Sequence, residues 1–448
     1  MKFILESSDE TLTTHSGLAL IGLLLSKTKL NNRLNEIKIP EIKSKPSVLN
    51  SDVARAYIGL LCQSKNDFDH IEEFRDDDFF QLALQLENVP SSPTLRQRLD
   101  QAAHLKSWTS ILKEESMSIL SQLEVEPTPL VVGVGLDQRS YVPLDIDVSP
   151  FDNSGTKKEG VSRTYKGHDG YAPIFAYVGT EGYGVNTELR EGSTHSQNGA
   201  VEFIAQSIRY AKMLSNRPLL LRVDAAHDSK DTIKLCFDKE TTADFIIKRN
   251  PRREKPEAWL MIAQQRGICC EEREGKKVYR GSMNVNLPGI NRPVRQVFEV
   301  IERTITSDGQ ILLVPDISFS LYWTTLPDAP STIIRLYRDH ATSEQFHSEL
   351  KTDMDLERLP SGKFLTNDLI LHFGLFAYNL LRFIGQSTLK SSDIPLKKKV
   401  HRRRIKTVIQ TMITLASKLV FHARRFKLKF GRGNPWFTVF NHLYKEFC

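Results

Sequence analysis

The sequence lacks several features that mark secreted, metal-stapled or nucleotide-driven proteins. Its five cysteines have no metal-binding spacing, and the adjacent pair Cys269-Cys270 is not a zinc-knuckle pattern. We therefore expect free thiols in a reducing compartment. The first residues contain no signal-peptide core, so we expect a cytoplasmic protein. The chain also has no glycine-rich phosphate-cradling loop, which argues against a nucleotide-hydrolysing motor.

Long apolar runs are scarce as well. The longest, residues 368–384, is interrupted by His372, Asn379 and Arg382. A buried helix is therefore a better interpretation of this run than a membrane span. The chain has 448 residues, of which 40% are hydrophobic and 26% charged, as in an ordinary globular protein. This length is enough for two or three domains.

Acidic residues are absent from one region near the C-terminus. Between Leu396 and Arg432 there are thirteen Lys or Arg residues and no Asp or Glu. The formal net charge of the whole chain is only +7, so the rest of the protein is acidic overall. A local basic block predicts a polyanion-binding surface, and nucleic acid is the commonest polyanion. A membrane-surface helix is the alternative interpretation.

Residues 1–125 have the pattern of a helical domain. Helix-start signals occur at Ser16, at Ser51-Asp52 and at Pro93. The helix that Pro93 opens carries Arg96 and Arg98, so it is a candidate for reading DNA. A plain helical bundle explains the same pattern. We expect this domain to bind DNA or to mediate dimerisation.

The period of the apolar residues changes at Leu130. Strand-like runs at 130–136, 141–149, 171–178, 185–189 and 219–223, with helical patterns at 200–214 and 230–237, predict an α/β core over residues 126–250. Pro143 weakens the prediction of a central strand. Residues 251–330 have little helical period and several β-like runs, which predict a β-rich insertion.

The core is expected to resume in residues 331–390 with a helix from Tyr337 to Lys351. This stretch contains good helix formers and no Gly or Pro. At about 100° per residue, Tyr337, His340, Glu344 and Lys351 share one face, whereas Glu349 points about 120° away from Tyr337. One face of the helix would thus present a phenol, an imidazole, a carboxylate and an ammonium group.

Two aspartates at strand ends complement Glu344. Asp147 and Asp224 each end an apolar strand, and carboxylates gathered in this way are the usual ligands of Mg²⁺. Two such ions can stabilise both the attacking and the leaving oxygen in phosphodiester cleavage. In a strand, Asp145 and Asp147 share a face, so either could be the ligand. Asp147 is favoured because it lies at the end of its strand.

The spacing Tyr337-x2-His340-x3-Glu344-x6-Lys351 resembles the Y-x2-R-x3-E-x6-K signature of bacterial insertion-sequence transposases with a DDE catalytic triad. Further stretches resemble one branch of them, the DDE group one transposases. The similarity covers roughly residues 130–436, and the stretches occur in the family's order: 144–149, 166–171, 189–192, 222–224, 349–351, 358–362, 377–381 and 423–430, continuing to Pro435-Trp436.

The resemblance implies an RNase H-like catalytic core with an inserted β-rich subdomain, flanked by helical N-terminal and basic helical C-terminal regions, the latter over residues 391–448. It implies Asp147, Asp224 and Glu344 as catalytic ligands of Mg²⁺, for which Mn²⁺ can substitute. It also implies a homodimer that binds double-stranded DNA, both terminal inverted repeats and target DNA, in the bacterial nucleoid. The DNA-binding residues expected from the signature and the basic tail are Tyr337, His340, Lys351, Arg402, Arg403, Arg404, Arg424 and Arg425.

Two residues depart from the family's pattern. His340 stands where the signature has Arg, and His is a weaker, pH-dependent phosphate contact. Ala225-Ala226 replaces the Ser-Gly that often follows the second aspartate. Two alternatives to a cut-and-paste transposase therefore stay open. One is a metal-dependent, structure-specific nuclease on the same core, and the other is a non-catalytic DNA-binding protein derived from a transposase.

Overall fold

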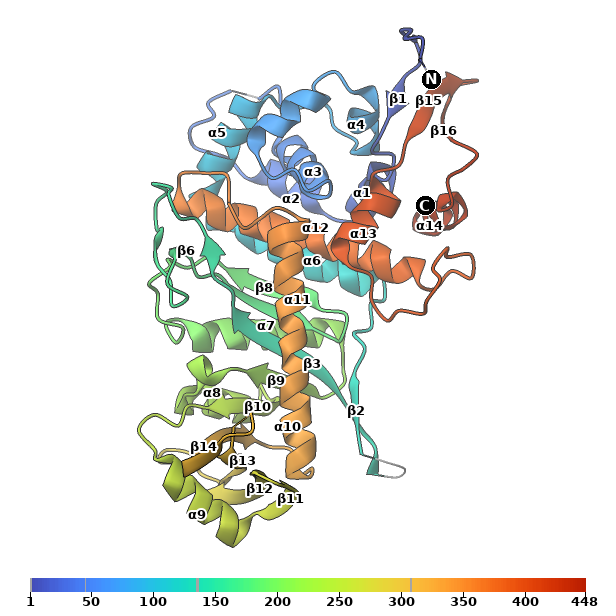
Figure 1. Ribbon diagram of the computed structural model, residues 1–448. Coiled ribbons are helices and arrows are strands. Elements are labelled where there is room, and N and C mark those ends of the chain that lie inside the picture. Colours follow the sequence, from blue (N-terminus) through green and yellow to red (C-terminus); the bar gives the residue numbers. More distant parts are fainter. Residues whose placement is uncertain (1, 45, 134–136, 307) are drawn as a thin grey trace.

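The computed structural model describes residues 2–44, 46–133, 137–306 and 308–448. It is a mixed α/β structure in which helices of both chain ends pack at one end of a large twisted sheet (Figure 1). A long helical segment lies along the sheet between these helices and the far strands. The predicted strand at 130–136 falls partly outside the described residues.

The N-terminal region is helical, as predicted. Ser16 precedes the first helix but does not cap it, because its Oγ donates to Leu415 O at 2.7 Å. Ser91 caps the helix that Pro93 opens, since its Oγ accepts a hydrogen bond from Thr94 N at 3.3 Å. Arg98 is buried and donates to Asn50 Oδ1 at 2.7 Å, so it serves the packing of the bundle. The helices are α1 (Leu18–Ser26), α2 (Leu30–Glu36), α3 (Asn50–Leu61), α4 (Asp78–Ala83), α5 (Ser92–Ala103) and α6 (Lys106–Gln122).

The core of the molecule is a mixed sheet. Its strands run in the order β8-β7-β3-β9-β10, with β3, β9 and β10 parallel and β7 and β8 antiparallel. Pro143 is tolerated within β3 because the ladder between β3 and β7 extends only from Leu144 to Val148. The elements are β2 (Leu130–Val132), β3 (Arg139–Val148), β7 (Ile174–Val178), β8 (Tyr183–Glu188), α7 (Ala200–Leu214), β9 (Leu219–Val223), α8 (Lys230–Phe237) and β10 (Asp244–Arg249).

The predicted insertion does form strands, but they extend the same sheet. Strand β14 pairs antiparallel with β10, and β13, β12 and β11 follow outward. Residues 251–330 therefore lengthen the core sheet, and they also contain a helix, α9, that the sequence pattern did not predict. The elements are α9 (Pro256–Arg266), β11 (Ile268–Arg273), β12 (Lys276–Val285), β13 (Val294–Ile305) and β14 (Ile311–Thr324).

The stretch from Tyr337 to Lys351 is helical throughout, but not as one regular helix. It begins in α10 (Pro330–Arg338), tightens to a 3₁₀ turn (Asp339–Thr342), continues as α11 (Ser343–Ser348) and widens to a π-helical turn (Glu349–Asp353). The following helix, α12 (Phe364–Thr388), is buried along most of its length and packs on α3, α5, α6 and β8. No helix in the described ranges is long and apolar enough to cross a membrane.

The basic C-terminal region differs from the prediction of helices. It contains a hairpin of β15 (Ser417–His422) and β16 (Arg425–Phe430), and β15 pairs with β1 (Leu12–Thr13). The physical reason is the strict alternation of basic and apolar residues from Arg425 to Phe430, which has the period of a strand. The helices of this region are α13 (Ile405–Val408) and α14 (Phe437–Phe447).

Candidate active site

A cavity of about 820 Å³ lies at the carboxyl ends of β3 and β9, beside the α10–α11 segment. Asp147, Asp224 and Glu344 all line it. Strands β3 and β9 are parallel neighbours with Ile146 opposite Val223, so Asp147 and Asp224 follow at the same edge of the sheet. The three carboxylates predicted from the sequence are thus brought to one cavity by two strands and one helix.

Two of the three carboxylates are backed by buried histidines. Asp147 accepts a hydrogen bond from Val148 N at 2.8 Å, and its Oδ2 lies 3.6 Å from His347 Nε2. Asp224 accepts from Ala226 N at 3.1 Å, and its Oδ1 lies 2.9 Å from Nδ1 of a second buried histidine, His227. Each aspartate therefore keeps one side toward the cavity and one toward a histidine.

Glu344 differs from the two aspartates because it is exposed and makes no hydrogen bond or ion pair with the described residues. Burial opposes ionisation of Asp147, but the adjacent His347 outweighs it and holds the pKa of this carboxyl below its ordinary value. Burial also lowers the pKa of His347. Asp147 thus presents an ionised carboxylate to the cavity at neutral pH.

The donor set fits a hard divalent cation by its chemistry, since it consists of carboxylate oxygens from three elements on one cavity. Across the described ranges, however, no three His, Cys, Asp or Glu side chains lie close enough together to hold a metal ion. Asp147, Asp224 and Glu344 therefore surround the cavity without forming a closed ligand cage.

Two residues of the cavity were missed by the sequence analysis. Tyr165 is 66% exposed, but its hydroxyl donates to Val148 O at 3.3 Å. Although most of the side chain is exposed, desolvation of its hydroxyl and the charges of all three carboxylates raise the pKa of Tyr165 to about 12, so the hydroxyl stays protonated. Lys166 beside it is exposed and has no carboxylate partner among the described residues. The signal was present in the Tyr-Lys-Gly sequence at the start of a glycine-containing loop.

The remaining signature residues line the same cavity. Tyr337 packs on Tyr322, with ring centroids 5.0 Å apart, and burial raises the pKa of its hydroxyl. The ammonium of Lys351 donates to the carbonyl of Pro150 and lies 5.3 Å from the ring centroid of Phe151. Burial lowers the pKa of Lys351. Both side chains reach the cavity while being partly held by the protein.

His340 and Asp145 belong to a buried network beneath the cavity. The carboxylate of Asp145 accepts two hydrogen bonds from Arg222, at 2.6 and 2.7 Å, and lies 3.0 Å from His340 Nδ1. Arg222 also donates to Leu336 O at 2.7 Å. Burial opposes ionisation of Asp145, but Arg222 and His340 outweigh it and lower the pKa of the carboxyl. The network ties β3, β9 and the helical segment together.

Glu349, expected on the face away from the cavity, is buried and paired. Its carboxylate forms ion pairs with Arg382 and with Arg402, the latter at 2.6 Å, and its side chain is 1% exposed. Removing this carboxylate would leave Arg382, which is fully buried, without its anion. Although Glu349 does not line the cavity, the substitution Glu349→Ala would therefore damage the fold.

The predicted DNA-binding arginines fall into two groups. Arg402 pairs with Glu349, Arg404 pairs with Asp353 at 2.8 Å, and Arg403 is 4% exposed with its guanidinium 4.2 Å from the ring centroid of Trp436. These three arginines hold the C-terminal region on the core. Arg424 and Arg425, in contrast, are exposed at the turn of the β15–β16 hairpin.

The hairpin itself has one basic and one apolar face. Arg425, Lys427 and Lys429 alternate along β16 with Phe426, Leu428 and Phe430, so the two sets lie on opposite faces. Lys427 and Lys429 were not predicted as binding residues, because the prediction rested on the number of basic residues in this region and not on their alternation with apolar ones. These three basic side chains are exposed and have no carboxylate partner in the part of the chain that the structure describes.

The family model described as "Transposase DDE domain group 1" matches residues 4–447. The chain belongs to this transposase family. No curated protein matches the sequence significantly. Among solved structures, the chain is similar to that titled "Cryo-EM structure of piggyBac transposase synaptic complex with hairpin DNA", with a TM-score of 0.41 and 10% sequence identity over 90% of this chain and 82% of that chain.

The family match confirms the resemblance to DDE transposases. It covers the N-terminal helices and the C-terminal hairpin as well as the sheet. All three parts of the structure therefore lie within the region that matches the family. DDE transposase domains generally use divalent metal ions, which agrees with the carboxylates around the cavity.

Proposed function

We propose that this transposase binds the terminal inverted repeats of an insertion sequence, cleaves DNA there and joins the ends to target DNA. The observation that carries the proposal is the convergence of Asp147, Asp224 and Glu344 on one open cavity. The mixed strand order, with parallel β3, β9 and β10 and antiparallel β7 and β8, supports an RNase H-like core. The same proposal includes a homodimer, a bacterial origin and a location in the nucleoid.

Asp147, Asp224 and Glu344 would hold Mg²⁺, with Mn²⁺ as a substitute. When bound, such ions neutralise the charge that develops on phosphodiester oxygens during cleavage. The protein's own residues supply the rest of the site. Lys166 and Lys351 bring positive charge to a cavity lined by carboxylates, which favours the approach of a phosphate backbone. The protonated hydroxyl of Tyr165 is a hydrogen-bond donor for a phosphate oxygen.

The role proposed for His340 changes with its contacts. Its Nδ1 faces Asp145, so the ring helps to orient the buried carboxylate beneath the cavity, and the residue also lines the cavity. Tyr337 and Lys351 remain the signature residues proposed to contact the DNA end. On the C-terminal hairpin, the proposed contacts are Arg424, Arg425 and the two lysines of β16.

The deciding experiment is a strand-transfer assay. The full-length protein is incubated with a duplex that carries the element's end, with a plasmid target, and with Mg²⁺, Mn²⁺ or EDTA. We expect metal-dependent cleavage at the end and joined products. Cleavage without joining would support the nuclease alternative, and end binding without cleavage in either metal would support the non-catalytic alternative. Absence of both binding and cleavage would overturn the proposal.

A further inference from the structure

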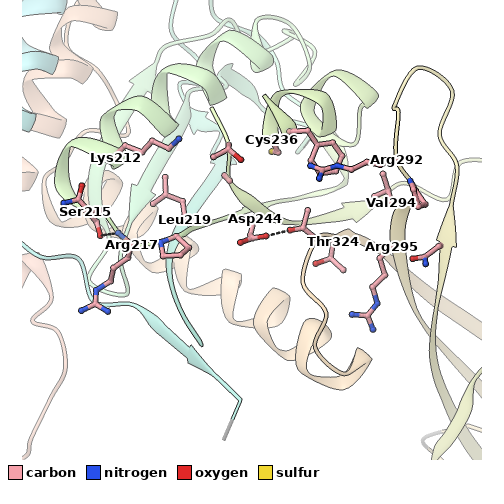
Figure 2. A pocket seen from close by; sticks show the side chains of 18 residues that line it. Lys212, Ser215, Arg217, Leu219, Cys236, Asp244, Arg292, Val294, Arg295 and Thr324 are labelled. Atoms are coloured by element: carbon pink, nitrogen blue, oxygen red, sulfur yellow. Dashed lines mark hydrogen bonds between the residues drawn. The ribbon is translucent and has the colours of Figure 1, made fainter. Parts of the chain in front are cut away.

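A second cavity, of about 890 Å³, lies at the opposite edge of the central sheet (Figure 2). It is lined by Leu219 and Asp244, the first residues of the parallel strands β9 and β10, whereas the carboxylate cavity lies where β9 ends. At about 3.3 Å per residue, the five residues of β9 separate the two cavities by roughly 17 Å. A ligand in one cavity is therefore clear of the other.

The second cavity is strongly basic. Four cationic side chains line it, and Asp244 is the one acidic residue among its described lining residues. The carboxylate of Asp244 accepts a hydrogen bond from Thr325 Oγ1 at 2.7 Å, so its charge is turned toward the protein. The cations come from both the core and the β-rich extension of the sheet, and they are Lys212, Arg217, Arg292 and Arg295.

These cations are positioned by neutral groups. Lys212 donates to Glu240 O at 3.0 Å, and Arg295 donates to the carbonyls of Leu326 and Asp328 at 2.6 and 2.7 Å. The guanidinium of Arg292 lies 3.5 Å from the ring centroid of Phe237. Across the described part of the chain, none of the four forms an ion pair with a carboxylate within 4.0 Å. Their positive charge is left uncompensated.

We propose that this basic cavity binds the sugar-phosphate backbone of a second segment of duplex DNA, separate from the segment at the carboxylates. Arginine presents planar donors that match phosphate oxygens, and Ser215, Asn216 and Thr242 add neutral donors beside them. The proposal rests on the proposed function, because it assumes that the protein acts on DNA.

The lining favours duplex DNA over a single strand. Proteins that bind single strands stack the bases on exposed aromatic side chains. Phe237 is the one aromatic residue among the described lining residues, and Arg292 covers its ring. The cavity thus offers charge and hydrogen bonds for phosphates but no platform for an unpaired base.

The test compares two double variants in a salt titration of DNA binding. The probe is a random-sequence duplex, and the cavity variant is Arg217→Gln with Arg292→Gln. The control is Arg209→Gln with Arg266→Gln, because both residues are exposed, have no ion pair in the described residues and do not line the cavity. Each lost phosphate contact lowers the slope of log affinity against log salt by about 0.9. We expect a slope lower by about 1.8 for the cavity variant and the wild-type slope for the control.

Two further measurements keep the outcomes distinct. Arg292→Lys retains the charge and should keep the wild-type slope, and Arg217→Gln alone, at an exposed position, should lose about 0.9 even if the double variant folds poorly. If the wild type binds duplex and the cavity variant has the same slope, the second DNA site is wrong and the proposed function stands. If the wild type neither binds nor cleaves duplex DNA, the proposed function fails and this proposal fails with it.

Discussion

Two layers of ionisable side chains lie one above the other in this protein, and the same elements supply both. The upper layer is Asp147, Asp224 and Glu344 at the cavity. The lower layer is Asp145, Arg222 and His340, which precede the upper residues by two, two and four positions. Because side chains on a strand face repeat every two residues and on a helix about every four, the two layers stack.

The carboxylates of the two layers differ in the partners that they pair with. In the lower layer Asp145 is 2% exposed, and a buried arginine and a buried histidine satisfy it. In the upper layer Asp224 is 41% exposed in its side chain, and Glu344 has no partner among the described residues. A shift of two residues along the chain of each strand thus separates a buried structural ion pair from a set of carboxylates that face the cavity. The lower layer fixes the elements that carry the upper one.

The largest expected effect comes from neutralising the upper layer. Asp147→Asn, Asp224→Asn or Glu344→Gln should each reduce DNA cleavage by at least about a hundredfold, because these groups are proposed to hold the ions that stabilise charge in the transition state. Binding of the element's end should persist. The readouts are a cleavage time course and a gel-shift assay. Asp339→Asn is the matched control, since Asp339 is an exposed acid on the same helical segment outside the cavity. An active Glu344→Gln variant would contradict the assignment.

Asp145→Asn should act through the fold. It leaves Arg222, itself buried, without its anion, so we expect a loss of about 3–5 kcal/mol in the free energy of unfolding. Urea denaturation measures this loss. Replacing both partners, with Asp145→Leu and Arg222→Met, should restore much of the stability. If the lower layer positions the carboxylates, this stable double variant still cleaves slowly. Wild-type cleavage by the double variant would show that the network serves stability alone.

His340→Gln should have a milder effect than Asp145→Asn. Asp145 keeps both hydrogen bonds from Arg222, so the expected loss is that of one buried hydrogen bond, about 1–3 kcal/mol. Cleavage should fall, because the helical segment that carries Glu344 would be less well positioned, and end binding should change little. Thermal denaturation and cleavage rates at one pH are the measurements. A variant with wild-type stability but weakened end binding would instead indicate that His340 contacts the DNA end.

The smallest expected effect contrasts Asp145 with a partly buried aspartate, Asp368 of α12. Burial raises the pKa of Asp368 to about 6, although its carboxylate accepts a hydrogen bond from Leu189 N at 2.9 Å. The folded protein therefore holds a proton that the unfolded chain releases near pH 4. By linkage, this residue makes stability fall as pH rises from about 4 to 6. Asp368→Asn should remove that fall, on the order of 1–3 kcal/mol, in urea titrations across this range. A wild-type pH profile in the variant would contradict the raised pKa.

Residues whose position depends on local period could be placed from the sequence, and those whose position depends on a distant partner could not. Strand ends and one helix face were enough to predict that Asp147, Asp224 and Glu344 lie near one another, and all three line one cavity. The partner of Arg222 is set by the register of β3 against β9, which no local pattern reveals. Likewise, Arg403 has the sequence context of a DNA-binding tail, but tertiary packing against Trp436 buries it. The prediction of helices in place of the β15–β16 hairpin was wrong, although the alternating pattern of β16 was present in the sequence.

The pairing of β1 with β15 has a consequence for how the protein is made. Leu12 lies opposite Lys418, and Ser16 N donates to Leu415 O at 3.1 Å, so the first strand completes its hydrogen bonds with residues about four hundred positions later. At about 5–20 residues per second, a ribosome needs roughly 20–80 s to synthesise that interval. During this time the edge of the N-terminal bundle is unpaired. A transposase monomer therefore matures only when its last strands have emerged, and a prematurely terminated chain retains an open N-terminal strand.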